Sequence, residues 1–411
     1  MMATTAKEYS YTGRNSANKV VKGRVDASSE SAVVSRLRAM GISPINIAEA
    51  RLGSGLSMEI NLPGFQKGVK LKDLSIMSRQ MSTMISSGLS LIRTLSILAE
   101  QTENKVLGAT LETVRSEVEA GAALSDAMAR QSRIFPPLMI SLVRAGEAGG
   151  FLEGTLESIA ITFEKDVKLR STIKSALTYP VAVLGIAFVA VVGMLIFVVP
   201  IFKEMFSSLG GELPVPTQFL VVLSENMIWL GPVLFIGIFG FSIWWRANKN
   251  EQKVLQFVDP LRLKIPVFGE LFKKVAIARF TRNFGTMLGS GVPILQSLKI
   301  VGETSGNYVI EQSLVKVAES VRQGKSISAP LALEPIFPAM VIQMIAVGED
   351  SGSLQTMLGK VADFYDEEVE STAEQLTALI EPLMIAVIGA VIGGMIVALY
   401  LPIFTIFDQI K

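Results

Sequence analysis

Two glutamates, each framed by glycines, are the first candidates for chemistry in this chain. Glu147 lies in the segment RAGEAGG, and Glu349 lies in AVGEDSG, 202 residues later (349 − 147 = 202). The framing glycines are Gly146, Gly150, Gly348 and Gly352. Such a carboxylate can serve in acid–base catalysis, bind a divalent cation, form an ion pair, or accept hydrogen bonds from amides at a helix N-terminus.

The composition leaves few residue types for catalysis. The 411 residues include no histidine and no cysteine, which excludes Ser-His-Asp triads, cysteine nucleophiles and Cys/His metal sites. Lysine plus arginine (38) almost balances aspartate plus glutamate (37), so no overall positive field attracts nucleic acid. We therefore predict no enzyme activity, no catalytic residue, no metal or other cofactor, and no nucleic-acid partner.

A second candidate is Gly324-Lys325-Ser326, which matches the end of a phosphate-binding loop. The full motif requires a glycine five residues before Gly324, where this chain has Glu319, and it requires a preceding strand, where the pattern here is helical. Nucleotide binding at this place is therefore not expected. Any energy that the protein uses must come from a partner.

A third candidate is a pair of dipeptides, Tyr179-Pro180 and Glu381-Pro382, each at the start of an apolar segment. They occupy matching positions of an internal duplication but differ in the side chain that could act as a base. Since a catalytic residue would rarely differ between such copies, the pattern favours two kinks at a membrane interface.

The elements that must position these residues include three membrane spans. Apolar runs without charge occupy residues 175–202, 226–245 and 382–407, and roughly 20 apolar residues cross a bilayer as a helix. Basic residues precede the first run and follow the second, which places those ends in the cytoplasm. We expect a cytoplasmic N-terminus without a secretory signal, an external loop at 203–225 and an external C-terminus.

An internal duplication organises the rest of the chain. The segment SRQMSTMISSGLSLI from Ser78 resembles TRNFGTMLGSGVPIL from Thr281, with an offset of 203 (282 − 79) that later becomes 202. A helical spacing of apolar residues recurs at the same offset: Leu107, Leu111, Val114 and Val118 return as Ile310, Leu314, Val317 and Val321. We predict two helical bundles of about six helices each, at 71–174 and 274–381, with a connector at 246–273.

A small module precedes the first bundle. Residues 1–50 contain two strand-like segments, a helix from Ser31 to Met40 with Val33, Leu37 and Met40 on one face, and a third strand. Residues 51–70 are rich in glycine and serine and read as a linker. The predicted fold class is therefore mainly α, with a small N-terminal α+β module.

The duplication explains why the glycine-framed glutamates occur twice. We expect Gly146 and Gly348 to close one helix, and Gly150 and Gly352 to free the turn before a long helix to the membrane. Each carboxylate would then interact with amides at the next helix N-terminus. An ion pair or divalent cation between bundles or subunits stays open as the other interpretation, because both acids are retained while their neighbours differ.

The ordered set of motifs resembles one known family. The paired SSGLSL and GSGVPI, the two glycine-framed glutamates, TYP and IEP at the span entrances, GELPVPTQ and the repeated PIF are similar to the GspF/PilC family, the inner-membrane platform proteins of type II secretion and type IV pilus assembly. The resemblance implies six-helix cytoplasmic bundles and a multi-pass protein of the inner membrane. It also implies self-association, as a dimer or tetramer, and three classes of partner: a cytoplasmic hexameric assembly ATPase, a pilin or pseudopilin, and other inner-membrane assembly proteins.

The competing function is an oligomeric membrane channel or transporter subunit. Ion pathways generally place ionisable residues inside the spans, whereas these spans are free of charge except for Glu381 at one entrance. The charge-free spans therefore favour a scaffold over an ion pathway. The family resemblance implies that such a scaffold transmits motion from an ATPase to subunits being extracted from the bilayer.

Overall fold

The computed structural model describes residues 7–14, 20–27, 30–49, 68–208, 213–249 and 251–409. The chain divides into two compact units, an N-terminal module up to Gln66 and a helical body from Lys67 onward. Most of the predicted linker, residues 51–67, lies outside the described residues.

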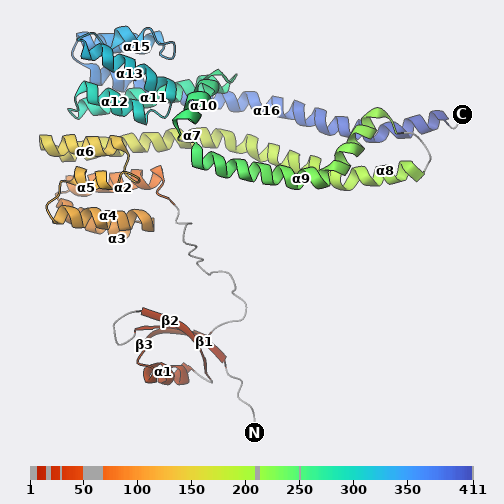
Figure 1. The fold of residues 1–411 in the computed structure, drawn as a ribbon, viewed down its shortest axis with the longest axis horizontal. Helices are drawn as coiled ribbons and strands as arrows, with labels where there is room; N and C mark the ends of the chain where they lie inside the picture. The colour runs from red at the N-terminus through yellow and green to blue at the C-terminus, as the bar shows by residue number, and fades with distance from the viewer. Residues whose placement is uncertain are drawn as a thin grey trace. The chain divides into compact units, whose positions relative to one another are not determined.

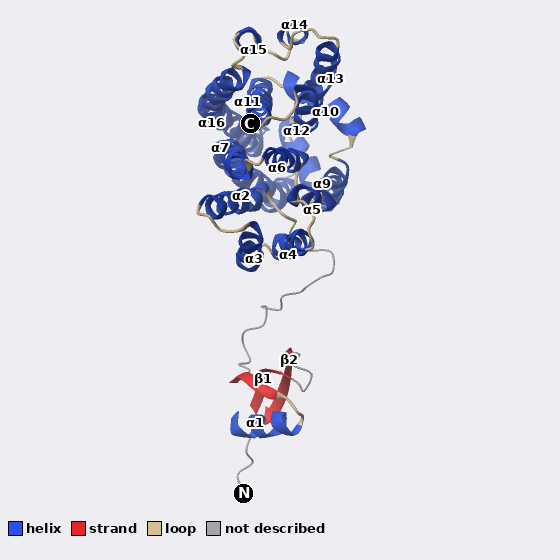
Figure 2. Ribbon diagram, turned by 90° about the vertical axis from the view of Figure 1, so that its left-hand side faces the viewer, coloured by secondary structure: helices blue, strands red, loops and turns tan. Residues whose placement is uncertain are grey.

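The N-terminal module is a three-stranded antiparallel sheet with one helix, as predicted. Its elements are β1 (Lys7–Arg14), β2 (Val20–Ala27), α1 (Glu30–Ala39) and β3 (Ser43–Glu49), and the strand order is β2-β1-β3. Figure 2 shows the strands in red and the helix α1 in blue. Val33 and Leu37 are fully buried, but Met40 is 61% exposed. The prediction for Met40 is wrong because α1 ends at Ala39, so the chain has left the helical face before this residue.

The helical body contains the duplicated unit twice, and each copy has six helices. The first repeat comprises α2 (Leu71–Ser86), α3 (Leu91–Gln101), α4 (Lys105–Glu119), α5 (Leu124–Arg130), α6 (Pro137–Gly149) and α7 (Leu152–Gly193). The second repeat comprises α11 (Phe268–Gly289), α12 (Ile294–Thr304), α13 (Tyr308–Arg322), α14 (Ser328–Leu331), α15 (Ala339–Asp350) and α16 (Leu354–Gln409). Figure 1 shows both sets, coloured orange to yellow-green and cyan to blue.

Local signals set the helix ends identically in the two repeats. Asn104 accepts hydrogen bonds from the second and third amides of its helix, α4, and Asn307 does the same for α13, which satisfies donors that the helix itself leaves unpaired. Four glycines with positive φ follow helices at matching positions: Gly88, Gly121, Gly291 and Gly324. These glycines therefore end the same two helices in both repeats.

The periodic apolar residues form the bundle cores. Leu107, Leu111 and Val114 on α4 are buried, and so are Ile310, Leu314 and Val317 on α13. Burial of apolar surface contributes about 25 cal/mol of stabilising free energy per Å². These buried helix faces therefore contribute most of the free energy that holds the short helices together.

Two long helices lead from the bundles into the predicted spans. α7 continues through a π-helical turn, η1 (Met194–Val198), into α8 (Val199–Ser208), and α16 runs unbroken over 56 residues. The segments 152–206, 229–248 and 354–404 are long and apolar enough to cross a membrane, so the three predicted spans are confirmed. The second span belongs to α9 (Val215–Asn248), which α10 (Gln252–Lys264) follows.

The helices that carry the three spans pack together at their ends farthest from the bundles. A buried apolar cluster joins Leu195, Val199, Leu220, Val221, Met395, Ala398 and Leu399. Ser224 on α9 donates a hydrogen bond of 2.5 Å to the carbonyl oxygen of Leu195, in the π-helical turn. Residues 203–208 and 215–225, predicted as loop, are helical here.

Candidate functional site at the contact between the two repeats

The two glycine-framed glutamates cap short helices. The carboxylate of Glu147 accepts hydrogen bonds from the backbone amides of Leu124 (2.6 Å) and Ser125 (3.0 Å) at the start of α5. Glu349 accepts from the amides of Ile327 and Ser328 at the start of α14. The N-cap residues of the two short helices, Ala123 and Ile327, supply no side-chain cap. The two carboxylates therefore satisfy first-turn amides that would otherwise lack partners.

The capped helix differs from the expected one. The sequence predicts amides of the long helix that follows each glutamate, whereas the structure places amides of the preceding short helix there. The reason lies in the helix packing. Glu147 lies on α6, which packs against α5, and Glu349 lies on α15, which packs against α14, so each carboxylate meets the start of the preceding short helix.

The four framing glycines have two separate tasks. Gly150 (φ 73°) and Gly352 (φ 67°) adopt the left-handed conformation after α6 and α15, as expected for the turn before each long helix. Gly146 and Gly348 do not close a helix, because α6 continues to Gly149 and α15 to Asp350.

Gly146 and Gly348 instead allow a close crossing. A Cβ atom on Gly146 would lie 3.1 Å from Cα of Leu152, and one on Gly348 would lie 2.8 Å from Cα of Leu354. Only glycine admits the first turn of the long helix at such distances. The predicted role of these residues as hinges, or as contacts to another subunit, stays a prediction.

No group of three or more acidic side chains within the described residues is arranged to hold a metal ion. Both glutamates bind amides of their own repeat, so the contact between the bundles must involve other residues. That contact is the site that the sequence analysis missed.

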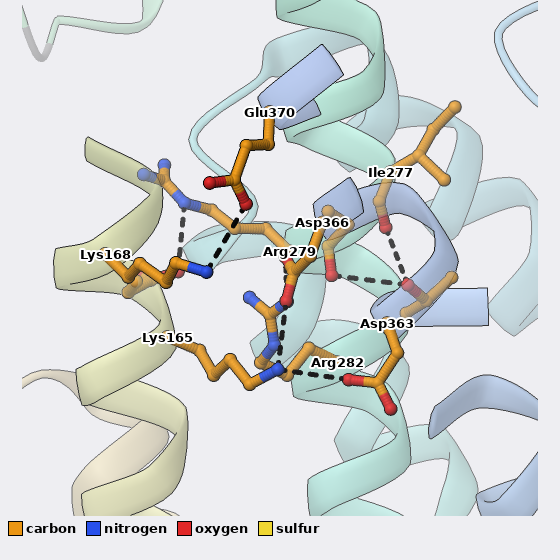
Figure 3. A network of polar contacts seen from close by, with 11 residues as sticks. Lys165, Lys168, Ile277, Arg279, Arg282, Asp363, Asp366 and Glu370 are labelled. Carbon is orange, nitrogen blue, oxygen red and sulfur yellow. Dashed lines mark hydrogen bonds and ion pairs between the residues drawn. The ribbon is translucent and has the colours of Figure 1, made fainter. Parts of the chain in front are cut away.

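Ion pairs join α7 of the first repeat to α11 and α16 of the second. Nζ of Lys165 lies 3.2 Å from a carboxylate oxygen of Asp363 and 3.4 Å from one of Asp366 (Figure 3). Nε of Arg279 lies 3.3 Å from Oδ1 of Asp166. These pairs connect residues separated by more than one hundred positions, so they fix how the two bundles meet.

Asp366 is the centre of this network. It accepts a hydrogen bond from Arg282 of its own repeat and pairs with Lys165 of the other. The Arg282 side chain is only 8% exposed, so its charge has little water and depends on the carboxylate. The carboxylate of Asp366 therefore links α16 to α11 within the second repeat and also links α16 to α7 of the first repeat.

Towards the spans the contact becomes apolar. Leu169 of α7 packs with Leu271 of α11 and with Val369, Ala373 and Leu376 of α16. Thr377 donates a hydrogen bond of 3.4 Å to the carbonyl oxygen of Ala176. Residue numbers increase together along this contact, so α7 and α16 run side by side in the same direction (Figure 1).

One sequence signal could have found this contact. α7 carries Lys165 and Lys168, while the matching positions of α16 carry Glu367 and Glu370. Opposite charges on equivalent helix faces of two repeats indicate that the faces can meet. From the sequence alone, the lysines were interpreted only as a sign that this end of the first span faces the cytoplasm.

The other sequence candidates lie apart from this network. Gly324 ends α13, and Ser326 Oγ accepts a hydrogen bond from the amide of Ala329, as at an ordinary helix start. Pro180 and Pro382 lie inside α7 and α16, which continue past them. The predicted kinks at Tyr179-Pro180 and Glu381-Pro382 stay predictions.

The first repeat also contains a cluster of charged side chains, in which Arg79 of α2 donates hydrogen bonds to Glu164 and Glu157 of α7. Each of the three hydrogen bonds measures 2.6 Å. The two bonds to Glu164, followed by the one to Glu157, raise the pKa of Arg79 above its already high ordinary value. This cluster holds α2 against α7.

A comparison with known protein families finds the same family in each of the two repeats. The model of the family "Type II secretion system (T2SS), protein F" matches residues 77–200 and again residues 280–402. The chain belongs to this family. The model of the protein F N-terminal domain matches residues 2–48, the N-terminal module. The two matches begin 203 residues apart (280 − 77) and end 202 apart (402 − 200), as the repeats do.

Relatives named for type IV pilus assembly and for type II secretion align over nearly their whole length. The chain is 38% identical to a type IV pilus assembly protein PilC of Myxococcus xanthus over 98% of this chain and 96% of the relative. It is 39% identical to a PilC of Thermus thermophilus over 98% and 99%. A type II secretion system protein F of Vibrio cholerae is 30% identical over 96% and 97%.

Proposed function

We propose that this protein F family member is the inner-membrane platform of a machine that assembles type IV pili. The relatives named for assembly of type IV pili or type 4 fimbriae are 33–39% identical to this chain, against 30–31% for those named for type II secretion, which favours a pilus over a secretion pseudopilus. Assembly of a secretion pseudopilus remains the other outcome to test. An oligomeric channel or transporter subunit has no comparable support among these relatives.

The observation that carries the mechanism is the continuity of each bundle with its span. α7 and α16 each extend from a bundle core into a candidate span without an intervening loop, so a displacement of either bundle is passed to its span. We infer that a cytoplasmic assembly ATPase moves the bundles, and that the spans pass this motion to pilin or pseudopilin subunits leaving the bilayer.

The proposal includes the arrangement in the membrane and the partners. The N-terminus and both bundles would lie in the cytoplasm and the C-terminus outside, because basic residues cluster around the bundle ends of the first two spans. Other inner-membrane assembly proteins, and further copies of the chain as a dimer or tetramer, would complete the platform.

The test is deletion of the gene with separate measurements of surface filaments and of secreted enzymes. We expect filaments to disappear while secretion continues, and the full-length gene to restore them. Loss of secretion with normal filaments would move the protein to the secretion machine. Unchanged filaments and unchanged secretion would refute the platform function.

Coupling between the bundles can be tested in the same strain. Lys165→Glu places like charges against Asp363 and Asp366 and should reduce filament assembly, since the bundles would no longer meet correctly. Lys325→Glu, at an exposed position just after α13 and away from the contact between repeats, is the control for a simple change of charge. Full assembly by the Lys165 variant would contradict the proposed role of this contact.

A further inference from the structure

The same face of the repeat is covered in the second copy and exposed in the first. In the second repeat the face on α11 and α16 receives α7, and it includes Arg279, Arg282, Thr286, Asp363 and Asp366. Subtracting 203 on the first helix and 202 on the last gives the matching residues of the first repeat: Ile76, Arg79, Thr83, Ile161 and Glu164. We call these five residues the open face.

The open face differs from its covered counterpart in exposing apolar side chains. Ile76, in place of Arg279, is 49% exposed, and Ile161, in place of Asp363, is 44% exposed. Ile161 precedes the predicted span by 14 residues (175 − 161), which is about 21 Å along a helix. Lipid is therefore too far away to cover these side chains, and a protein partner is the better explanation for them.

The charged side chains at the open face form ion pairs between its two helices, α2 and α7. Arg79 from α2 is 35% exposed and pairs with Glu157 and Glu164 from α7, whose side chains are 47% and 43% exposed. A surface that carries both aliphatic groups and both signs of charge is complementary to itself. In a two-fold dimer each isoleucine can meet an isoleucine, and Arg79 of one copy can approach a carboxylate of the other.

Continuing the contact between repeats from one molecule to the next would fit the open face poorly. That contact is head-to-tail, because α7 offers Thr162, Lys165 and Asp166 to a different set of residues on the second repeat. Their counterparts on α16 are Phe364, Glu367 and Glu368. Glu367 of a second copy would then face Ile161 and Glu164, where Lys165 now faces two aspartates, so the attraction would become repulsion.

We propose that a second copy of this chain docks on the open face through its own open face, with α7 beside α7. Two copies with the same orientation in one bilayer require a two-fold axis along the membrane normal, so the two α7 helices run parallel and equivalent residues meet. This inference deepens the proposed function by giving the surface of self-association, and it rests on that function for the shared membrane.

The test uses the absence of cysteine from the chain. Ile76→Cys and Ile161→Cys are made singly in the full-length protein, and membranes are treated with a short bifunctional maleimide. We expect a covalent dimer with at least one of the two variants. Ile92→Cys, on α3 and 41% exposed, is the matched control and should stay monomeric.

Two results would overturn the proposal. One is that both open-face cysteines react with a monofunctional maleimide but yield no more dimer than the Ile92 variant. The other is stronger cross-linking between an Ile161→Cys copy and a Phe364→Cys copy than between two Ile161→Cys copies, which would establish the head-to-tail arrangement.

A charge variant separates the dimer from filament assembly. Ile161→Glu puts two carboxylates at the axis and should halve the mass of the detergent-solubilised assembly, while Ile92→Glu should leave it unchanged. An unchanged mass for the Ile161 variant would refute the surface. A dimer that cross-links through the open face in a strain whose filaments do not depend on the gene would retain this inference and refute the platform function.

Discussion

The same ion pair occurs in both repeats and has a different environment in each. Arg79 pairs with Glu164, and the matching residues Arg282 (282 − 79 = 203) and Asp366 (366 − 164 = 202) pair with each other. Arg79 is 35% exposed, whereas α7 covers the second pair and leaves Arg282 8% exposed. The duplication copied the bond, and the contact between repeats then determined how much water surrounds it.

The helices that carry this pair also pack differently. In the first repeat Ser82 on α2 donates a 2.7 Å hydrogen bond to Glu157 on α7. The matching positions in the second repeat are Gly285 and Gly359, and a Cβ on Gly285 would lie 3.2 Å from Cβ of Leu358. Polar contacts hold the exposed pair of helices, and close packing holds the covered pair.

The largest expected difference between repeats comes from removing the two arginines. Arg282→Ala leaves Asp366 partly buried with only Lys165, and should lower the free energy of unfolding by about 3 kcal/mol. Arg79→Ala removes an exposed cation and should cost about 1 kcal/mol or less. Denaturant unfolding in detergent measures both, and equal losses would show that water reaches the two pairs equally.

Next in size is the crossing of the helices at the framing glycines. Gly348→Ala would press Cβ against the backbone of Leu354, and a loss of about 3 kcal/mol is expected. Gly146→Ala meets the buried side chain of Thr155 and lies farther from the backbone of the long helix, at 3.1 Å from Cα of Leu152, so a smaller loss of about 2 kcal/mol is expected. Gly359→Ala, with open space around it, is the control and should be neutral or stabilising. A harmless Gly348 variant would contradict the close crossing.

A smaller effect, equal in both repeats, is expected for the capping glutamates. Glu147→Gln and Glu349→Gln each keep the shape but lose the charge at two amides, so each should cost about 1 kcal/mol in thermal unfolding. Glu103→Gln, which makes no cap of this kind, is the control. Normal stability with lost oligomers or filaments in either variant would favour contact with another subunit over capping.

The smallest effect is expected at Lys168 and Glu370. Their charged atoms are 3.4 Å apart and their side chains are 69% and 50% exposed, so Lys168→Gln should change stability by less than about 0.5 kcal/mol. Raising the salt concentration should abolish even that difference. A loss as large as that of Arg282→Ala would mean that this end of the contact is far less hydrated than its exposure indicates.

The sequence by itself determined the elements and their number. Asparagine caps, glycines after helices and the spacing of residues such as Leu107 and Leu111 act within a few positions, so their effect can be read locally. Because of the duplication, each of these helix caps, glycines and apolar patterns occurs in both repeats. The apolar runs needed only their length to indicate spans.

The tertiary structure decided which of two equivalent surfaces is used. Nothing near Glu147 in the sequence indicates that its carboxylate meets the amides of Leu124 and Ser125, because that depends on how two helices pack. Likewise, Arg79 and Arg282 have matching places in their repeats. Only the docking of α7 on the second repeat, a sum of many weak contacts between distant segments, buries one of them and leaves the other on the open face.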